Sequence, residues 1–404
     1  MDWGRIAQER LAEIATCSLP GAGVTRFPFT PEHRDALNLI RVWMDRAGLV
    51  TSLDAAGTLV GHAPGEGPSV LLGSHQDSVR DAGRYDGIMG IALACLALEK
   101  LRVEGIALGY PVEVLAFADE EGVRFPTALL GPRALAGTID SNVFDMVDSD
   151  GVRLRDALDA FGGKSDDVTA LGRNPADVRC YLEVHIEQGP VLETRDSPVG
   201  VVTGICGIER NTVTFRGETG HAGTVPMQGR SDALVAAADF IRAAHDAARK
   251  VQDLRATVVT CRISPGVANG IPDLTELTLE IRAPNDSIRE DFAAKMKAEA
   301  KICADRRGTS FAIERTYLQP AVPCAQNLCD VLSKSIAATG HAGVVTLPSG
   351  ATHDASAMAD LCDIGMLFVR CRHGLSHRPE EFASAENMGV AIDVLANTLM
   401  VLGQ

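Results

Sequence analysis

Three short segments in the first half of the chain combine side chains of the types and spacing that a two-metal site needs. They are Gly-Ser-His75-Gln-Asp77, Gly-Arg-Tyr-Asp86-Gly and Asp-Glu120-Glu121-Gly. Two divalent cations that share one carboxylate need further ligands on each side, and a free carboxylate that takes a proton from the bridging water. We expect His75, Asp86 and Glu121 to bind metal, and Glu120 to be the free base. The pattern predicts metal-assisted hydrolysis.

Each segment also has an ordinary interpretation: a loop hydrogen bond for His75 and Asp77, a turn aspartate for Asp86, and a solvated acidic loop around Glu120. Two further histidines weigh against these interpretations, because His185 ends Tyr-Leu-Glu-Val-His and His377 lies in Gly-Leu-Ser-His-Arg. Three histidines and three carboxylates at expected strand ends together favour a metal centre. Asp77 is expected to orient His75. Imidazole and carboxylate ligands without thiolate admit Mn²⁺, Zn²⁺ or Co²⁺.

These side chains require strands that end at one edge of a sheet. The apolar runs 69–73, 112–118 and 180–185 predict buried strands, 90–103 predicts a crossover helix, and 365–370 predicts a further strand. The carboxyl ends of parallel strands are where ligands collect in open α/β sheets. We therefore predict an α/β catalytic domain of residues 1–210 and 317–404.

The order of elements changes between residues 211 and 316. Strands are predicted at 211–216, 255–263, 275–282 and 310–316, and helices at 231–251 and 287–306. This is the βαββαβ order of a ferredoxin-like domain. Leu277, Leu279 and Ile281 alternate with polar residues, so one face of that strand is predicted to be buried. We predict a small domain inserted into the larger one.

The inserted domain supplies residues suited to binding substrate. Arg282 ends a predicted strand, and its guanidinium suits bidentate recognition of a carboxylate, although a surface ion pair is the alternative. His221, in Gly-His-Ala-Gly, could stabilise an oxyanion once the domains close, or it is simply a loop histidine. Asn269 lies on the same domain.

Composition narrows the class of partner and the compartment. The chain has 404 residues, 53 acidic against 38 basic side chains, and ten cysteines without a Cys-x-x-Cys pair. The length favours two domains, and the negative charge argues against nucleic acid or an anionic membrane as partner. Irregularly spaced cysteines are typical of free thiols in a reducing compartment. We expect a cytoplasmic protein without a secretory signal or membrane span, acting on a small molecule.

The motif set resembles the co-catalytic metallopeptidase superfamily of aminoacylases and carboxypeptidases, and within it the amidohydrolases of ureido acids. The resemblance rests on seven segments in order along the chain, namely GSHQDSVRDAGRYDG at 73–87, FADEEGVRFP at 117–126, GPRALAGT at 131–138, VHIEQGPVLE at 184–193, GHAGTVPM at 220–227, SGATHDA at 349–355 and GLSHRP at 374–379. It implies a mixed-sheet metallopeptidase-like catalytic domain with an inserted ferredoxin-like dimerisation domain.

By that resemblance His75 and His185 bind one metal, Glu121 and His377 bind the other, and Asp86 bridges them. Glu120 is then the general base and acid, and Asp77 orients His75. The substrate-holding positions implied by the family are Gln188, His221, Asn269, Arg282 and Gly350. His221, Asn269 and Arg282 are expected to reach the active site of the partner in a homodimer, so that a monomer would be inactive.

Two substrates stay open within this family, allantoate and an N-carbamoyl-L-amino acid, with a β-ureidopropionase as a variant of the second. The segments at 27–34 and 366–371 favour allantoate, whereas the residues before Asp86 also suit carbamoylases. The chain departs from common family patterns at Gly270, Thr352 and His373. A catalytically inactive small-acid binding protein is the alternative from another class, and Glu120 separates the two because a binder has no use for an uncoordinated carboxylate beside the metals.

Overall fold

The protein forms two compact units in the computed structural model, which describes residues 1–341 and 343–403. The first unit comprises Met1–Thr203, Cys324–Leu347 and Ala351–Gln404, and the second comprises Gly204–Pro323 and Pro348–Gly350. The predicted insertion, 211–316, lies inside the second unit, which extends further in both directions. Gly350, predicted in the catalytic domain, belongs to the second unit. One reason is that the Cys206 backbone N–H donates to the Ser349 carbonyl at 2.9 Å.

The first unit is built on a mixed sheet, as predicted. The strand order of this sheet is β1 (Val50–Leu53), β2 (Leu59–Ala63), β4 (Val112–Phe117), β3 (Ser69–His75), β5 (Val178–Ile186), β13 (Ile364–Val369), β6 (Val199–Ile205) and β11 (Val322–Pro323), and β12 (Thr346–Ser349) also pairs with β6. By the bounds given above, β11 and the last residues of β6 and β12 are counted in the second unit. The central strands β4, β3, β5 and β13 run parallel, and their outer neighbours β2 and β6 run antiparallel to them. The parallel centre therefore brings the carboxyl ends of four strands to one edge.

Every residue of β4 and β13 is buried, as expected for parallel strands whose two faces are both covered by helices. The helices of the unit are α1 (Trp3–Ile14), α2 (Pro31–Arg46), α3 (Ile88–Val103), α4 (Leu130–Ala136), α5 (Leu154–Ala160), α6 (Val191–Thr194), α9 (Gln326–Ala338), α10 (Asp354–Met358) and α11 (Ala385–Leu402), with short 3-10 helices at Ser141–Asp145, Ser165–Ala170, Pro175–Asp177 and Arg372–Gly374. The crossover helix α3 is buried on nearly all sides, as its Ala- and Leu-rich sequence requires.

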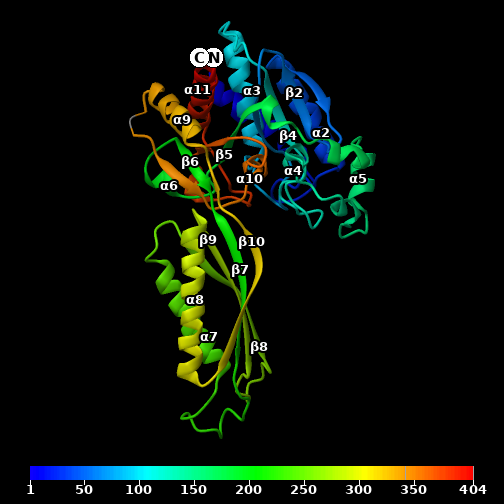
Figure 1. Cartoon of the computed structure of the whole chain (residues 1–404). Coiled ribbons are helices and arrows are strands. Elements are labelled where there is room, and N and C mark those ends of the chain that lie inside the picture. Colours follow the sequence, from blue (N-terminus) through cyan, green and yellow to red (C-terminus); the bar gives the residue numbers. More distant parts are fainter. Residues whose placement is uncertain (342, 404) are drawn as a thin grey trace. The chain divides into compact units, whose positions relative to one another are not determined.

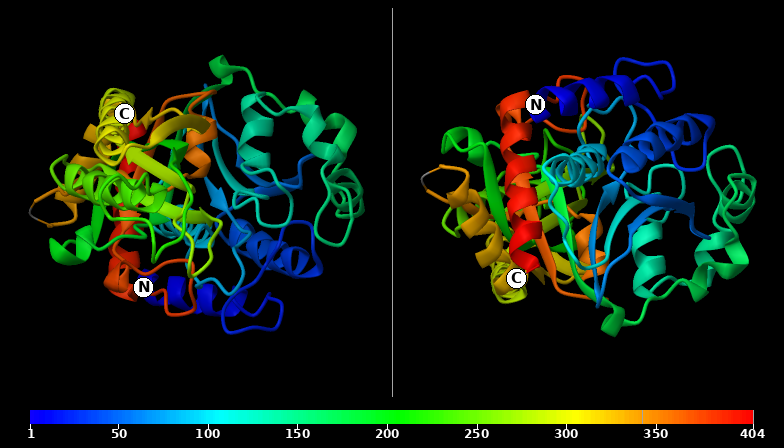
Figure 2. Two further views of the ribbon diagram at one scale, coloured as in Figure 1. Left: turned by 90° about the horizontal axis from the view of Figure 1, so that it is seen from below. Right: turned by 90° about the horizontal axis from the view of Figure 1, so that it is seen from above.

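Helix α11 is long and apolar enough to cross a membrane by length and composition alone. It contacts α1, α3 and α9, and Figure 2 shows its red ribbon beside the dark blue α1. Met388, Ile392, Leu395 and Leu399 are buried by these contacts. The apolar residues of α11 are thus explained by the protein core.

The second unit has the predicted βαββαβ order. Its elements are β7 (Gly207–Arg216), α7 (Ala233–Ala248), β8 (Arg255–Ser264), β9 (Leu274–Ala283), α8 (Asp286–Arg307) and β10 (Ser310–Gln319). The strands form an antiparallel sheet in the order β10-β7-β9-β8, and α7 and α8 pack together against it (Figure 1). Phe215, Phe240, Leu277, Ile281 and Phe292 lie in the core between helices and sheet. The ferredoxin-like fold is confirmed.

Two strands of this sheet differ in burial. In β9, buried residues alternate with half-buried ones, which confirms the predicted alternation of Leu277, Leu279 and Ile281. Strand β8 lies at the edge of the sheet and is exposed over most of its ten residues, including Val259 and Ile263. An exposed edge strand presents unpaired backbone groups to another chain.

Candidate metal centre

Two buried histidines lie at the ends of neighbouring parallel strands. His75 is the last residue of β3, and His185 is the penultimate residue of β5. The Nδ1 of His75 lies 3.0 Å from the Asp77 carbonyl, and the Nδ1 of His185 lies 2.8 Å from the Ile186 carbonyl. A carbonyl at Nδ1 selects the tautomer whose Nε2 has a free lone pair, which is the form that binds metal.

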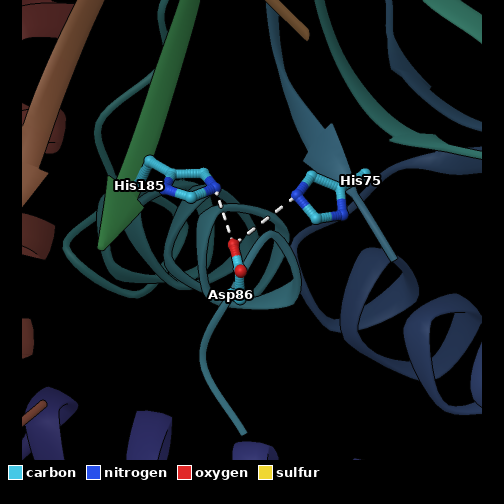
Figure 3. Close-up of side chains that lie close together, drawn as sticks. All are labelled: His75, Asp86 and His185. Atoms are coloured by element: carbon cyan, nitrogen blue, oxygen red, sulfur yellow. Dashed lines mark ion pairs between the residues drawn. The ribbon is translucent and has the colours of Figure 1, made fainter. Parts of the chain in front are cut away.

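Asp86 lies where both Nε2 atoms point. Its Oδ1 is 3.7 Å from Nε2 of His75 and 3.1 Å from Nε2 of His185, as Figure 3 shows. Asp86 lies two residues before the first residue of α3, and the intervening Gly87 has φ 64°. A Cβ on Gly87 would lie 2.4 Å from the His75 ring. This turn therefore needs glycine, both for its positive φ and for its close approach to His75.

The other oxygen of Asp86 faces a second set of ligands. Its Oδ2 lies 3.1 Å from Nε2 of His377, and that Nε2 lies 3.7 Å from Oε1 of Glu121. Glu121 follows β4, whereas His377 lies in the loop after β13 with φ 57° and a half-exposed ring. The two oxygens of Asp86 therefore address two different ligand groups.

Asp77 holds the acidic segment after β4 in place. Its carboxylate accepts hydrogen bonds from the backbone N–H groups of Glu120, at 3.1 Å, and Glu121, at 3.2 Å. The expectation that Asp77 orients His75 needs correction in its detail. The Asp77 carbonyl makes that contact, and the carboxylate oxygen is 3.8 Å from the His75 Nδ1. One aspartate thus links the His75 ring to both glutamates.

The described residues form four groups of potential ligand atoms, and two of these groups share Asp86; the other two are His75 with Glu120 and Glu121, and His185 with Glu183 and His353. Of the two that share Asp86, one consists of His75, Asp86 and His185, and the other of Asp86, Glu121 and His377; within each group the ligand atoms lie within 4.8 Å of one another. These two are the sets that the sequence predicts for two metals. Glu120 lies beside them, with an oxygen 4.0 Å from Nε2 of His75.

The electrostatics of the cluster favour the binding of cations. Burial, together with the charge of Glu121, raises the pKa of Glu120 well above its usual range, and burial with the charge of Asp86 raises the pKa of Glu121 to about 8. Burial would also raise the pKa of Asp86, but hydrogen bonds with His185 and His377 hold it well below its usual value. Cations between these groups would relieve the repulsion among the carboxylates.

Orphaned polar atoms support the same conclusion. Oε1 of Glu121 is buried and makes no hydrogen bond within the described part of the chain, and the buried Nε2 of His185 has no ion-pair partner there except Asp86, at 3.1 Å. An unsatisfied buried polar atom is costly unless something else binds it. Imidazole and carboxylate groups suit Zn²⁺, Mn²⁺ and Co²⁺ alike, so the residues fit a pair of divalent cations of any of these kinds.

The predicted substrate-binding residues fall into both units. Gln188 belongs to the first unit, and its side-chain amide donates to Oδ2 of Asp86 at 3.0 Å. In the second unit, exposed His221 lies close in the backbone to Asn269, whose carbonyl accepts from Ala222 at 2.9 Å. Arg282 donates to the Gly350 carbonyl at 2.6 Å.

The alternative for Arg282, an ion pair with a neighbouring acid, is correct in part, because its Nε also donates to Glu280 at 2.8 Å. Of the three positions that depart from family patterns, Gly270 forms a β-bridge with His221, and exposed His373 lies 3.6 Å from Glu193. Thr352 is half-buried directly before His353.

Several buried polar residues around the ligands were missed by sequence reasoning. Glu183 accepts from Ser74 at 3.0 Å and from the Ala355 backbone at 2.8 Å, which joins β3, β5 and α10. His353 packs edge-on against the His185 ring, with centroids 4.4 Å apart. A charged residue inside the apolar run Tyr-Leu-Glu-Val-His was a signal for Glu183, because a buried carboxylate needs partners.

Comparisons with known proteins agree with this geometry. Residues 71–401 match the model of a protein family that is described as Peptidase family M20/M25/M40. The chain is 36% identical over 400 residues to an N-carbamoyl-L-amino acid amidohydrolase of Geobacillus stearothermophilus, covering 98% of each chain. It is 37% identical over 418 residues to an allantoate deiminase of Arabidopsis thaliana, covering 95% of this chain and 80% of the relative.

A solved structure gives the same result at the level of the fold. An amidase of the hydantoinase/carbamoylase family from Burkholderia multivorans superposes with a TM-score of 0.92 at 28% identity, over 98% of this chain and 97% of that one. The chain therefore belongs to peptidase family M20/M25/M40, and it is a hydrolase that acts on C–N bonds.

Proposed function

We propose that this protein is a metal-dependent amidohydrolase that cleaves the C–N bond of a ureido acid, with allantoate as its substrate. The observation that supports this most is the pair of ligand groups that share Asp86, with buried Glu120 beside them. The names of relatives support the ureido acid class, since they include both N-carbamoyl-L-amino acid amidohydrolases and allantoate deiminases.

The residues divide the chemistry among them. His75, His185, Asp86, Glu121 and His377 would hold two divalent cations, which supply Lewis acidity and a water of lowered pKa when bound. Glu120 takes the proton of the attacking water and returns it to the departing nitrogen, which leaves as ammonia. Buried Glu120, with an oxygen 4.0 Å from Nε2 of His75, lies where it can hold this proton between the two steps. The carbamate that remains can lose carbon dioxide.

Substrate recognition is assigned to the polar residues outside the ligand set. Arg282 would pair with the substrate carboxylate through its planar guanidinium, and His221 would stabilise negative charge on the carbonyl oxygen. Asn269, Gly350 and Gln188 complete the proposed set. Holding the carboxylate fixes the ureido carbonyl relative to Glu120, which is how remote contacts raise the rate of the reaction.

N-carbamoyl-L-amino acids are the second candidate substrate. The 36% identity to the Geobacillus enzyme extends over 98% of both chains, whereas the allantoate deiminase of Arabidopsis is matched over 80% of its length. The test is ammonia release from allantoate and from a panel of N-carbamoyl-L-amino acids with Mn²⁺ present. Turnover of allantoate alone supports our proposal, and faster turnover of a carbamoyl amino acid replaces allantoate by the second candidate.

We also propose that the protein is a cytoplasmic homodimer that pairs through the second unit. The ten-residue edge strand β8 exposes Val259 and Ile263, and a second copy could extend the sheet along this edge. In such a dimer His221, Asn269 and Arg282 of one subunit would complete the active site of its partner. Neither nucleic acid nor a membrane is part of the proposal, in keeping with the net charge of −15.

A further inference from the structure

Glu381 is a buried carboxylate next to the metal centre that belongs to none of the potential metal-binding groups among the described residues. Only 4% of its surface is exposed. Its Oε1 accepts hydrogen bonds from the backbone N–H groups of Tyr85, at 2.9 Å, and Asp86, at 3.0 Å. Its Oε2 accepts a hydrogen bond from Ser376 Oγ at 2.7 Å. One carboxylate therefore contacts two loops that are distant in sequence.

Both loops supply a ligand of the same metal position. Asp86 lies between β3 and α3, and His377 follows Ser376 in the loop after β13; neither residue is held by a strand. His377 has φ 57° and a half-exposed ring, and the contacts of its Nε2 are with Asp86, Glu121 and Gln188. His75 and His185, in contrast, are residues of paired strands. The Asp86 and His377 pair needs an additional restraint, and Glu381 provides one.

The surroundings of Glu381 are built for this contact. An ideal Cβ on Gly83 would lie 2.3 Å from Oε1 of Glu381, so any larger residue at position 83 would displace the carboxylate. Ser376 Oγ lies 3.4 Å from Oδ2 of Asp86, and the Gln188 amide donates to that Oγ at 3.1 Å. Hydrogen bonds from backbone N–H groups to a carboxylate are charge-assisted and strong. Loss of the Glu381 carboxylate would leave the two buried N–H groups of Tyr85 and Asp86 without this acceptor.

We propose that Glu381 is a positioning residue that fixes Asp86 and His377 relative to each other, and thereby sets the affinity of the metal position formed by Asp86, Glu121 and His377. The position formed by His75, His185 and Asp86 depends on it much less, because the strands hold both histidines. This inference rests on the proposed two-metal function and names a residue on which one of the two metals depends.

The test compares Glu381→Ala with Glu381→Gln by titrating Mn²⁺ into metal-free protein against a competing chelator. In the alanine variant we expect one metal, at the position formed by Asp86, Glu121 and His377, to lose about 10- to 100-fold in affinity, the range for partners that orient a ligand, while the other metal stays within about threefold. In the glutamine variant the carbonyl oxygen still accepts from both N–H groups, and the amide N–H donates to Ser376 Oγ, which keeps this contact with its direction reversed. Both metals should then bind within about threefold of the original affinity.

The control is Glu209→Ala, which removes a buried carboxylate of the second unit that binds Arg289 and Asn211. It should lower the melting temperature of metal-free protein and leave both affinities unchanged. The proposal is overturned if Glu381→Ala weakens both metals equally, or if Glu381→Gln is as defective as the alanine variant. Should Glu381→Ala fail to fold, Ser376→Ala supplies the same comparison, and unchanged affinity for both metals would overturn the proposal. Failure of the unmodified protein to bind two metals would instead reject the proposed function.

Discussion

At the scale of single residues, Glu120 is the side chain on which the proposed proton transfer depends. It lies beside both ligand groups, and its backbone N–H is held by Asp77. We expect Glu120→Gln to keep both metals and to lower the rate of ammonia release by at least about 100-fold, the range for losing a general base. Metal content and ammonia release would be measured on one preparation. Turnover close to that of the unmodified protein would remove this role from Glu120.

Arg282 makes a separate prediction that concerns the substrate. Its pairing with Glu280 and the Gly350 carbonyl holds the guanidinium in one orientation. We expect Arg282→Ala to raise KM for ureido acids by about 10- to 100-fold, since a charge-assisted pair is worth about 1.5–3 kcal/mol. Amidated analogues, which lack the carboxylate, serve as the control substrates. An equal loss with these analogues would contradict the assignment.

Metal binding should release protons. Burial and the charge of Asp86 raise the pKa of Glu121 to about 8. Burial lowers the pKa of His185, but its hydrogen bond with Asp86 outweighs this and raises it to about 9. Both groups are therefore protonated at pH 7 without metal and must lose a proton to become ligands. We expect apparent metal affinity to rise from pH 6.5 to 9. Calorimetry in two buffers of different ionisation enthalpy would count the protons, and a count of zero would reject these pKa values.

The raised pKa values of Glu121 and His185 also predict how the stability of the metal-free protein depends on pH. A group whose pKa is higher in the folded state stabilises the fold below its unfolded pKa, and this stability is lost as pH rises through the folded value. For His185 the window runs from 6.5 to about 9, and for Glu121 from 4.5 to about 8. The melting temperature of metal-free protein should therefore fall between pH 6.5 and 9. Bound metal replaces these protons, so the metal-loaded protein should show a smaller decrease.

At the scale of elements, the site depends on how closely α3 packs on the sheet. A Cβ on Gly90 would lie 2.2 Å from the Val184 carbonyl and 2.9 Å from Ser74 Cβ, next to His185 and His75. We expect Gly90→Ala to destabilise the protein by about 1–3 kcal/mol through overpacking and to lower metal affinity. Urea denaturation of the metal-loaded protein would measure the loss.

Gly389 in α11 is the matched control for Gly90. Both glycines lie inside helices, but a Cβ on Gly389 would meet only ordinary contacts, at 3.6 Å from Gly4. Gly389→Ala should therefore be neutral or stabilising by up to about 1 kcal/mol, because alanine favours the helix. Equal destabilisation by both substitutions would show that loss of glycine, and not the approach of α3 to the sheet, is responsible.

Sequence reasoning succeeded for elements with strong periodicity. The strand with Leu277, Leu279 and Ile281 and the strands that end at His75 and His185 were predictable because burial imposes a pattern on consecutive residues. Glu381 was not predictable. It follows Glu380 four residues after His377, and two adjacent acids look like a solvated pair. Its contact with Asp86 joins residues 295 positions apart and exists only in the folded chain.

The role of Asp77 shows a second limit of the same kind. Its residue type and spacing suggested a carboxylate that orients His75, yet the backbone carbonyl lies 3.0 Å from Nδ1 and the carboxylate binds the backbone of Glu120 and Glu121. The sequence gives the side chain, but the course of the backbone after β3 decides which oxygen reaches which partner. Which side chains gather at one place can therefore be read from motifs more safely than the hydrogen bonds that orient them.

At the scale of the whole molecule, the proposed dimer makes a prediction about shared active sites. If Arg282 of one subunit serves the partner, then a mixed dimer of Glu120→Gln and Arg282→Ala subunits contains one intact site, built from the unmodified Glu120 of one subunit and the unmodified Arg282 of the other. Random reassortment of a 1:1 mixture makes about half of the dimers mixed. We expect the mixture to recover about a quarter of the unmodified activity at low substrate concentration.

The control for this experiment uses the exposed edge strand. Val259 lies on β8 and is 52% exposed. A lysine placed on an edge strand opposes pairing of that edge with another chain, so Val259→Lys should produce monomers of unchanged fold, as measured by sedimentation and circular dichroism. Introduced into both inactive variants, it should also abolish the recovery of activity. Active monomers, or a mixture no more active than Arg282→Ala alone, would place Glu120 and Arg282 of the same subunit in one site and reject the shared arrangement.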